Sequence, residues 1–133
     1  MRITSIEKIS ILTYGPNKLF DITERVKELA SKVVEGVLFL QAIGSTGALL
    51  VLPTSREVLE KFERDLWDLV STLGWRHPGN AYAHLRSTLM GVWLALPVTD
   101  GKVVLGKNQG VYFLENQPAL NRRRTIIAVL VQE

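Results

Sequence analysis

The run TIIAVLV, residues 125–131, constrains the fold of this chain more than any other segment. Six apolar residues follow one another without a polar interruption from Ile126 to Val131, so both faces of an extended strand would be apolar here. A strand of this kind is covered on both sides, and it lies in the centre of a sheet or at an interface between subunits. The other strands therefore have to be arranged around the C-terminal one.

Up to eight segments have the short length and the β-branched or aromatic composition of strands. The clearest are residues 2–13, 37–43, 48–52, 92–98, 102–105, 110–115 and 125–131. Short turns join neighbouring strands, as in Thr99-Asp100-Gly101 and in the Gly-bounded segment GSTG (44–47), which is typical of a hairpin. These connections favour mainly antiparallel pairing.

Two amphipathic helices interrupt the strands. Asp21 and Glu24 have the spacing of a capping box, and an apolar stripe follows them at helical spacing. Thr54 and Glu57 repeat this spacing before a longer apolar stripe that ends at Gly74. Together with the strands, the two long helices predict one α+β domain over residues 1–133.

Length and composition limit the classes of function. The 133 residues include no cysteine, which excludes disulfides and thiolate chemistry. No apolar run approaches the roughly 20 residues of a membrane helix, and the N-terminus lacks the apolar core of a signal peptide, so we expect a cytoplasmic protein with no membrane partner.

The net charge is only +3, and the single dense basic cluster, Arg122–Arg124, is interpreted as a solvated turn, although its guanidinium groups could also bind a phosphate. Aromatic residues do not interleave with the basic ones, so we do not expect a nucleic-acid partner.

Three polar segments carry groups capable of chemistry: GSTG (44–47), RHPGNAYAHLR (76–86) and GKNQG (106–110). The first offers backbone N–H groups and the hydroxyls of Ser45 and Thr46, which can cradle a phosphate. The same spacing is also that of an ordinary turn, as is the spacing of GKNQG. Both interpretations stay open at this point.

Both histidines of the chain, His77 and His84, lie in the second of these segments, close to Arg86. Imidazoles serve as metal ligands, as general acids or bases and as donors to anions, and they also occur as surface or structural residues. A zinc site would need a third ligand, and the chain has no third histidine and no cysteine. No nucleophile elbow accompanies the histidines, which argues against a Ser-His-Asp hydrolase.

The stretches AHLRSTLMG (83–91), DGKVVLG (100–106) and RRRTIIAVLVQE (122–133), in this order, resemble the YjbQ-like family. The resemblance extends over nearly the whole chain. It implies a compact α+β sandwich that assembles into a homotrimer, with a site at the subunit boundary. It also implies secondary thiamine-phosphate synthase activity, the joining of a pyrimidine and a thiazole precursor.

The resemblance carries over to particular residues. His77 and His84 match the two downstream histidines of the family, and Arg86 matches its basic residue. His84 would then act as general acid or base, and Arg86 would neutralise pyrophosphate. With Ser45, Thr46 and Gln109 as further ligand-binding residues, the three polar segments would form one pocket.

Two departures from the family pattern stand out. The family has a His-Thr-Thr or His-Thr-Ser triple where this chain has Gly44-Ser45-Thr46, so one imidazole is missing. Asn108 stands where the family usually has Trp. With two imidazoles left, we expect phosphate or another anion to bind in preference to a tightly held metal. Two function classes remain: an enzyme acting on a phosphorylated small molecule, and a non-catalytic ligand-binding or scaffold trimer that has lost the activity.

Overall fold

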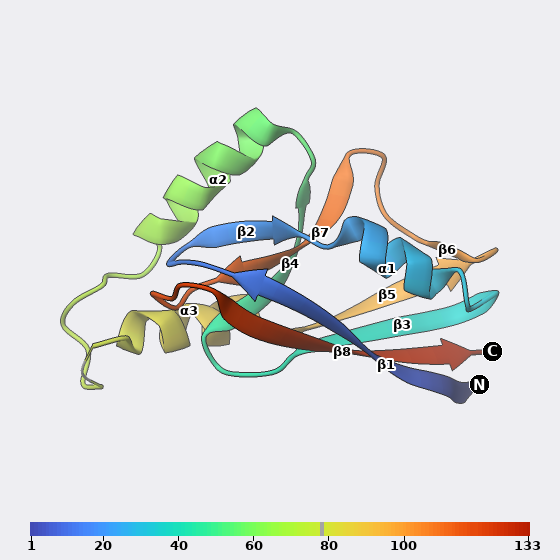
Figure 1. Ribbon diagram of the computed structural model, residues 1–133. Helices are drawn as coiled ribbons and strands as arrows, with labels where there is room; N and C mark the ends of the chain where they lie inside the picture. The colour runs from blue at the N-terminus through green and yellow to red at the C-terminus, as the bar shows by residue number, and fades with distance from the viewer. Residues whose placement is uncertain (78) are drawn as a thin grey trace.

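Eight strands and three helices occupy residues 1–77 and 79–133, which are the residues that the computed structural model describes (Figure 1). In chain order they are β1 (Arg2–Thr13), β2 (Lys18–Asp21), α1 (Thr23–Ala30), β3 (Glu35–Ala42), β4 (Gly47–Pro53), α2 (Arg56–Asp68), α3 (Ala81–Met90), β5 (Trp93–Thr99), β6 (Lys102–Val103), β7 (Gln109–Glu115) and β8 (Arg122–Gln132). They form a single-domain α+β fold, as the sequence predicts.

The strands form two sheets. The larger has the order β1-β8-β3-β5-β6 and the smaller the order β2-β7-β4, and every strand pair is antiparallel. The doubly apolar strand β8 lies between β1 and β3, so the prediction of a central position is confirmed. Its residues alternate between a buried face with Ile126 and a half-buried outer face with Ile127.

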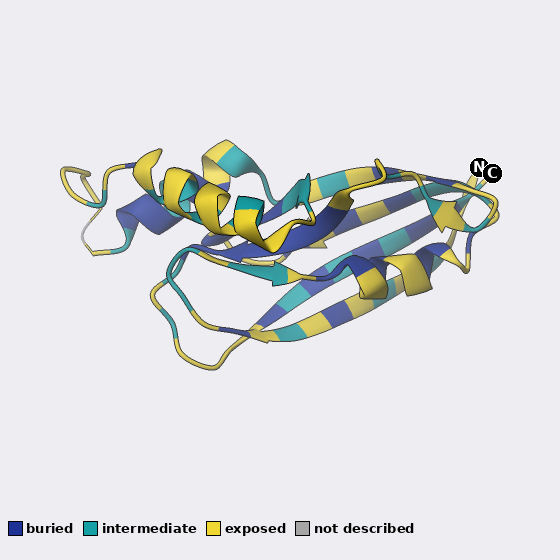
Figure 2. Cartoon of the chain, turned by 90° about the horizontal axis from the view of Figure 1, so that it is seen from above, coloured by how far each residue is buried: buried dark blue, intermediate teal, exposed yellow. Residues whose placement is uncertain are grey.

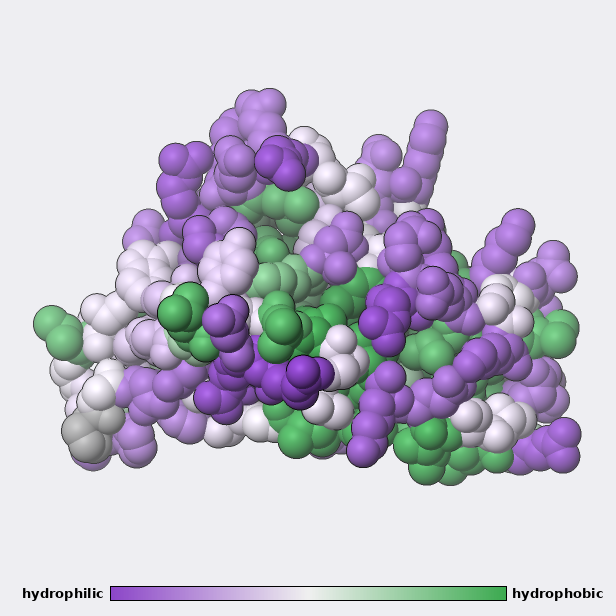
Figure 3. Space-filling model, viewed as in Figure 1, coloured by the Kyte–Doolittle hydropathy of each residue, from purple (hydrophilic) through white to green (hydrophobic). Residues whose placement is uncertain are grey.

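The main hydrophobic core lies between the two sheets and α1 (Figure 2), and a smaller cluster forms around Val70, Tyr82 and Ala83. The larger sheet contributes Leu38 and Leu130, the smaller sheet Phe113, and α1 Val26, all of them inaccessible to solvent. In the space-filling view, apolar side chains fill the space between α1, α2 and the sheets, while polar side chains cover the outer faces of these helices (Figure 3). Burial of these apolar side chains is the main force that holds the two layers together.

The GSTG segment does not form a hairpin turn. It follows β3 of the larger sheet and precedes β4 of the smaller one, so it carries the chain from one layer to the other. Two backbone hydrogen bonds fix it, from Ile43 N to Thr125 O at 2.9 Å and from Asn116 N to Thr46 O at 3.0 Å. The flanking apolar runs look alike in the sequence, and nothing local indicates that they belong to different sheets.

The helices differ from the prediction of two long ones. Helix α1 has 8 residues, and α2 ends at Asp68 after 13 residues. The apolar repeat beyond it includes Leu69 and Leu73, which are exposed and do not continue the helix. The third helix, α3, occupies most of the segment expected to be the histidine loop. None of the helices in the described residues is long and apolar enough to cross a membrane.

Candidate functional site

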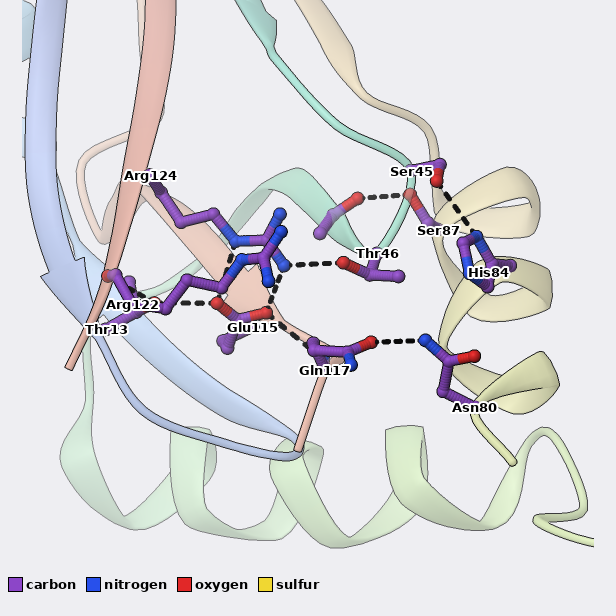
Figure 4. A network of polar contacts seen from close by, with 11 residues as sticks. Thr13, Ser45, Thr46, Asn80, His84, Ser87, Glu115, Gln117, Arg122 and Arg124 are labelled. Atoms are coloured by element: carbon purple, nitrogen blue, oxygen red, sulfur yellow. Dashed lines mark hydrogen bonds and ion pairs between the residues drawn. The ribbon is translucent and has the colours of Figure 1, made fainter. Parts of the chain in front are cut away.

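The two histidines lie side by side. Their ring centroids are 5.4 Å apart, with the ring planes inclined by 58°. His84 is half-buried on α3, whereas His77 lies in the exposed segment before that helix. The Ser45 hydroxyl is 2.9 Å from Nδ1 of His84 (Figure 4). Two of the three polar segments named from the sequence therefore meet at this point.

Helix α3 is held in place from both ends, and this positions His84. Near its C-terminal end Ser87 donates a hydrogen bond to the backbone oxygen of Gly47 in β4 (Figure 4). At its N-terminal end the Asn80 side chain donates to Gln117 Oε1 at 2.7 Å. The segment forms a helix because Ala, Leu, Arg and Met favour that conformation, and it ends at Gly91, whose φ of 93° suits glycine.

A pocket of about 310 Å³ opens beside the ring pair. Its lining consists of Trp75, Arg76, His77, Ala81, His84 and Leu85. We call it the histidine pocket. Its wall is mostly apolar, and the polar residues among its lining are His77, His84 and Arg76. Trp75 and Arg76 were not among the site residues predicted from the sequence, although Arg76 directly precedes His77.

Arg86 is not among the residues that line this pocket, although the sequence predicts it as the cation that binds the ligand. Its side chain is inaccessible to solvent. One guanidinium nitrogen, Nη2, donates to the backbone oxygens of Trp67 and Val70, the latter at 3.0 Å. The guanidinium also lies over the Trp67 ring, 4.2 Å from its centroid. Burial lowers the pKa of Arg86, and Tyr82 and Asp68 partly offset this. We assign Arg86 to holding the end of α2.

Thr46 faces the interior, where it joins a buried ion pair (Figure 4). Its hydroxyl accepts a hydrogen bond from Arg124 Nη2 at 2.7 Å, and Arg124 Nε donates to Glu115 Oε1 at 2.8 Å. Thr13 donates to the same carboxylate oxygen at 2.6 Å. Burial alone would raise the pKa of Glu115, but the hydrogen bonds from Arg124 and Thr13 outweigh it and hold that pKa below its usual value. Thr46 thus fixes the segment that presents Ser45.

Gly44 lies directly against this ion pair. Its φ is +109°, a conformation that L side chains rarely adopt, and a Cβ there would be 3.0 Å from Arg124 Nη1. The resemblance places a family imidazole at this position, and the backbone of this chain there suits glycine best. All of Arg122–Arg124 belong to β8, so the interpretation of this cluster as a turn was wrong. Arg122 and Arg123 are exposed, whereas Arg124 is buried.

Gln109 lies away from the histidine pocket. It is the first residue of β7 and pairs with Pro53, whereas Gly47, next to Ser45 and Thr46, pairs with Glu115 at the other end of the ladder. Six strand steps separate the two ends, about 20 Å. Within one chain, GKNQG is therefore not a wall of the histidine pocket.

The ligand set of the histidine pocket does not fit a tightly held metal. In residues 1–77 and 79–133 no three His, Cys, Asp or Glu side chains gather as metal ligands. Two imidazoles and the Ser45 hydroxyl leave zinc short of the usual set of three strong protein ligands. Imidazole, guanidinium and hydroxyl groups can instead donate hydrogen bonds to an anion.

Comparisons with known proteins place the chain in a family. The family model described as UPF0047 protein YjbQ-like matches residues 7–133. A UPF0047 protein of Archaeoglobus fulgidus is 31% identical over 126 residues, which cover 92% of this chain and 99% of the relative. Another, from Methanothermobacter thermautotrophicus, is 30% identical over 123 residues and 88% of this chain, or 86% of its own length.

Solved structures show the same fold. A hypothetical protein from Aeropyrum pernix K1 superposes with a TM-score of 0.87 at 26% identity, covering 98% of this chain and 100% of its own. A YbjQ-like protein of unknown function from Sulfolobus solfataricus P2 gives a TM-score of 0.80 at 25% identity, covering 94% and 97%. With a family match over all but the first six residues, this chain belongs to the UPF0047, or YjbQ-like, family.

Proposed function

We propose that the histidine pocket binds a small phosphorylated heterocycle. The observation that carries the proposal is the juxtaposition of His77 and His84, 5.4 Å apart, in one wall with Trp75 and Arg76. The indole and Leu85 offer apolar surface to a flat ring. The guanidinium and the imidazoles offer donors to a phosphate group. A volume of about 310 Å³ is at the lower end of the range for small-molecule pockets.

In the catalytic form of this proposal, the protein is a transferase resembling secondary thiamine-phosphate synthase. A bond from carbon to the thiazole nitrogen forms while the bond from that carbon to pyrophosphate breaks. Arg76 neutralises the leaving group, in place of Arg86. Ser45 holds Nδ1 of His84, which leaves Nε2 free to act as general acid toward pyrophosphate.

The alternative is a non-catalytic protein that binds a ligand or acts as a scaffold. Gly44 favours it, because the imidazole that the family carries there is absent and the backbone at φ +109° suits glycine. Retention of both downstream histidines in contact with each other favours the enzyme. Both candidates use the same pocket.

We propose further that the chain assembles into a homotrimer through the outer face of the larger sheet. Phe39, Trp93 and Ile6 are exposed on three strands of that face, with exposed fractions of 40%, 62% and 64%. No element of the described residues covers a neighbouring hollow of about 150 Å³, lined by Phe39, Leu40, Gln41, Trp93, Ile127 and Val129. Large apolar side chains at an exposed surface are typical of contacts between subunits.

One experiment separates the two candidates. Purified protein is incubated with the pyrimidine and thiazole precursors, and mass spectrometry detects the coupled product, while calorimetry measures binding of each precursor. Product from the natural chain and none from His84→Gln supports the enzyme. Binding without product supports the alternative. Neither product nor binding would overturn both.

A further inference from the structure

A second pocket, of about 430 Å³, lies on a different part of the molecule. Lys27 comes to it from α1, Lys102 from the β5–β6 hairpin and Lys107 from the loop before β7. Its other lining residues are Gly101, Val103, Leu105, Gly106 and Gln109. We call it the lysine pocket. Helix α1 and the segment 102–107, which are far apart in the sequence, thus contribute three lysines to one hollow.

These charges are not compensated by the protein. The lining includes no carboxylate. In the described residues Lys102 and Lys107 take part in none of the ion pairs, and Lys27 pairs only with Glu24 at 3.9 Å, where both side chains are well exposed. An exposed pair at that distance contributes little. Lysines that converge without a counter-charge raise the local concentration of anions.

The floor and rim of the lysine pocket add complementary features. Val103 and Leu105 are half-buried and pack against the main core, so they present apolar surface on a fixed base. The rim is closed by two hydrogen bonds, from Gly106 N to Gln109 Oε1 at 2.8 Å and from Gln109 N to Gly106 O at 3.1 Å. The oxygen of the Gln109 side chain is thereby occupied, and its NH₂ group remains a donor.

We propose that the lysine pocket binds a small organic diphosphate, with the phosphates on the three lysines and the organic part on Val103 and Leu105. The volume is within the range of small-molecule sites. The proposal does not depend on the function of the histidine pocket, because Gln109 and the Ser45 segment lie at opposite ends of the β4–β7 ladder. The GKNQG segment would then contribute to a ligand site separate from the histidine pocket.

The test is an NMR titration of ¹⁵N-labelled protein with adenosine diphosphate and, separately, with pyrophosphate. We expect both probes to shift the amide signals of Lys102, Gly106 and Lys107, with tighter binding of adenosine diphosphate because of the apolar floor. The double variant Lys102→Gln/Lys107→Gln should bind at least tenfold more weakly. Shifts confined to Ser45 and His84 would place the anion in the histidine pocket and overturn the proposal.

A matched control removes the same charge elsewhere. Lys18→Gln/Lys61→Gln also neutralises two exposed lysines, neither of which lines the lysine pocket. We expect this control to change the dissociation constant by less than twofold. Equal weakening in the two double variants would mean that net charge alone attracts the probes, and the site would be refuted. Amide spectra of the free variants confirm that each retains the fold.

Discussion

At the scale of single residues, the two buried arginines have different surroundings. Arg124 is paired with Glu115, while Arg86 is bound by two backbone oxygens and the face of Trp67. Nε and Nη1 of Arg86 find no acceptor in the described residues. Removal of either side chain would leave buried acceptors without their donor, so we expect both arginines to act on stability.

The first prediction separates Arg86 from Arg76. Arg86→Met keeps the length of the side chain but removes the donor to Trp67 O and Val70 O, so the free energy of unfolding should fall by about 2 kcal/mol. Sulfate affinity at the histidine pocket, measured from the amide shift of His84, should stay within twofold. Arg76→Gln should show the opposite: sulfate affinity at least tenfold weaker and stability unchanged in urea titrations. If Arg86→Met lost sulfate binding and Arg76→Gln kept it, Arg86 and not Arg76 would be the residue that binds the anion.

Glu115 leads to a prediction about acid. Its pKa is lowered in the folded protein, so its contribution to stability is present above the unfolded pKa of about 4.3 and is lost as the pH falls through the folded pKa. Glu115→Gln should cost about 3 kcal/mol or more at pH 7, because Arg124 is left buried without its counter-charge. Urea unfolding at pH 7 and pH 3 checks both points. The variant should lose less stability between these pH values than the natural chain, and equal losses would contradict the assignment.

Anion binding at the histidine pocket provides a second pH test. Imidazoles as a class gain a proton between pH 8 and pH 6, and protonated rings donate charge-assisted hydrogen bonds. Sulfate remains a dianion over this range, so any change in affinity reports on the protein. We expect tighter binding at pH 6, read from the amide shift of His84, and no such change in His77→Gln/His84→Gln. Stoichiometric zinc at nanomolar affinity without sulfate binding would contradict the preference for an anion.

At the scale of the elements, α2 is the least anchored helix. None of its side chains is buried, whereas α1 buries Val26, Leu29 and Ala30. Its contacts include hydrogen bonds at Glu63, whose backbone oxygen accepts from Asn17 at 2.5 Å and whose Oε1 accepts from Leu19 N at 3.1 Å. We expect the amides of α2 to exchange with deuterium faster than those of α1, since local opening is easiest where little apolar surface is buried. Equal protection of the two helices would contradict this.

Strand positions were predictable from the sequence, and the connections were less so. The apolar runs around Ile126 and Leu38 predict strands whatever the order of the strands in the sheet, because buried strand positions favour such side chains. The partners of a strand depend on contacts far along the chain, which is why GSTG was mistaken for a hairpin. Helix α3 was missed because a motif with two histidines suggested a loop, although its composition favours a helix.

The candidate site was predictable in part. His77, His84 and Ser45 lie together, as expected from their positions in polar segments that were predicted to form one pocket. The direction of a side chain is decided by packing, and the sequence did not reveal that Arg86 and Thr46 face the interior. Both predicted N-caps were wrong. The N-cap of α1 is Ile22 and not Asp21, although Asp21 Oδ1 accepts a hydrogen bond from Thr23 N at 2.9 Å. The N-cap of α2 is Ser55 and not Thr54, and Ser55 provides no side-chain bond.

At the scale of the whole molecule, the outer face of the larger sheet is the surface that the fold leaves apolar. Strand register places Ile6, Val129 and Phe39 in one row across β1, β8 and β3. The next row consists of Lys8 on β1, Ile127 on β8, Gln41 on β3 and Trp93 on β5, so it mixes two apolar with two polar side chains. The opposite face of the same strands packs into the core (Figure 2). One face of β8 is therefore covered by the second layer, and its other face is half-buried. We expect the proposed trimer to cover that outer face.

A second and third copy of the chain would provide that cover. We expect sedimentation equilibrium at micromolar concentration to give three times the chain mass of 14.9 kDa. Trp93→Lys should give a monomer, because a lysine in the middle of an apolar contact would lose its hydration without a counter-charge. Leu120→Lys is the matched control: Leu120 is 83% exposed and lies in the β7–β8 loop, outside both rows, so the trimer should persist. A natural chain that remains a monomer would exclude both this assembly and any site completed by a neighbouring subunit, and the histidine pocket of one chain would then have to bind its ligand alone.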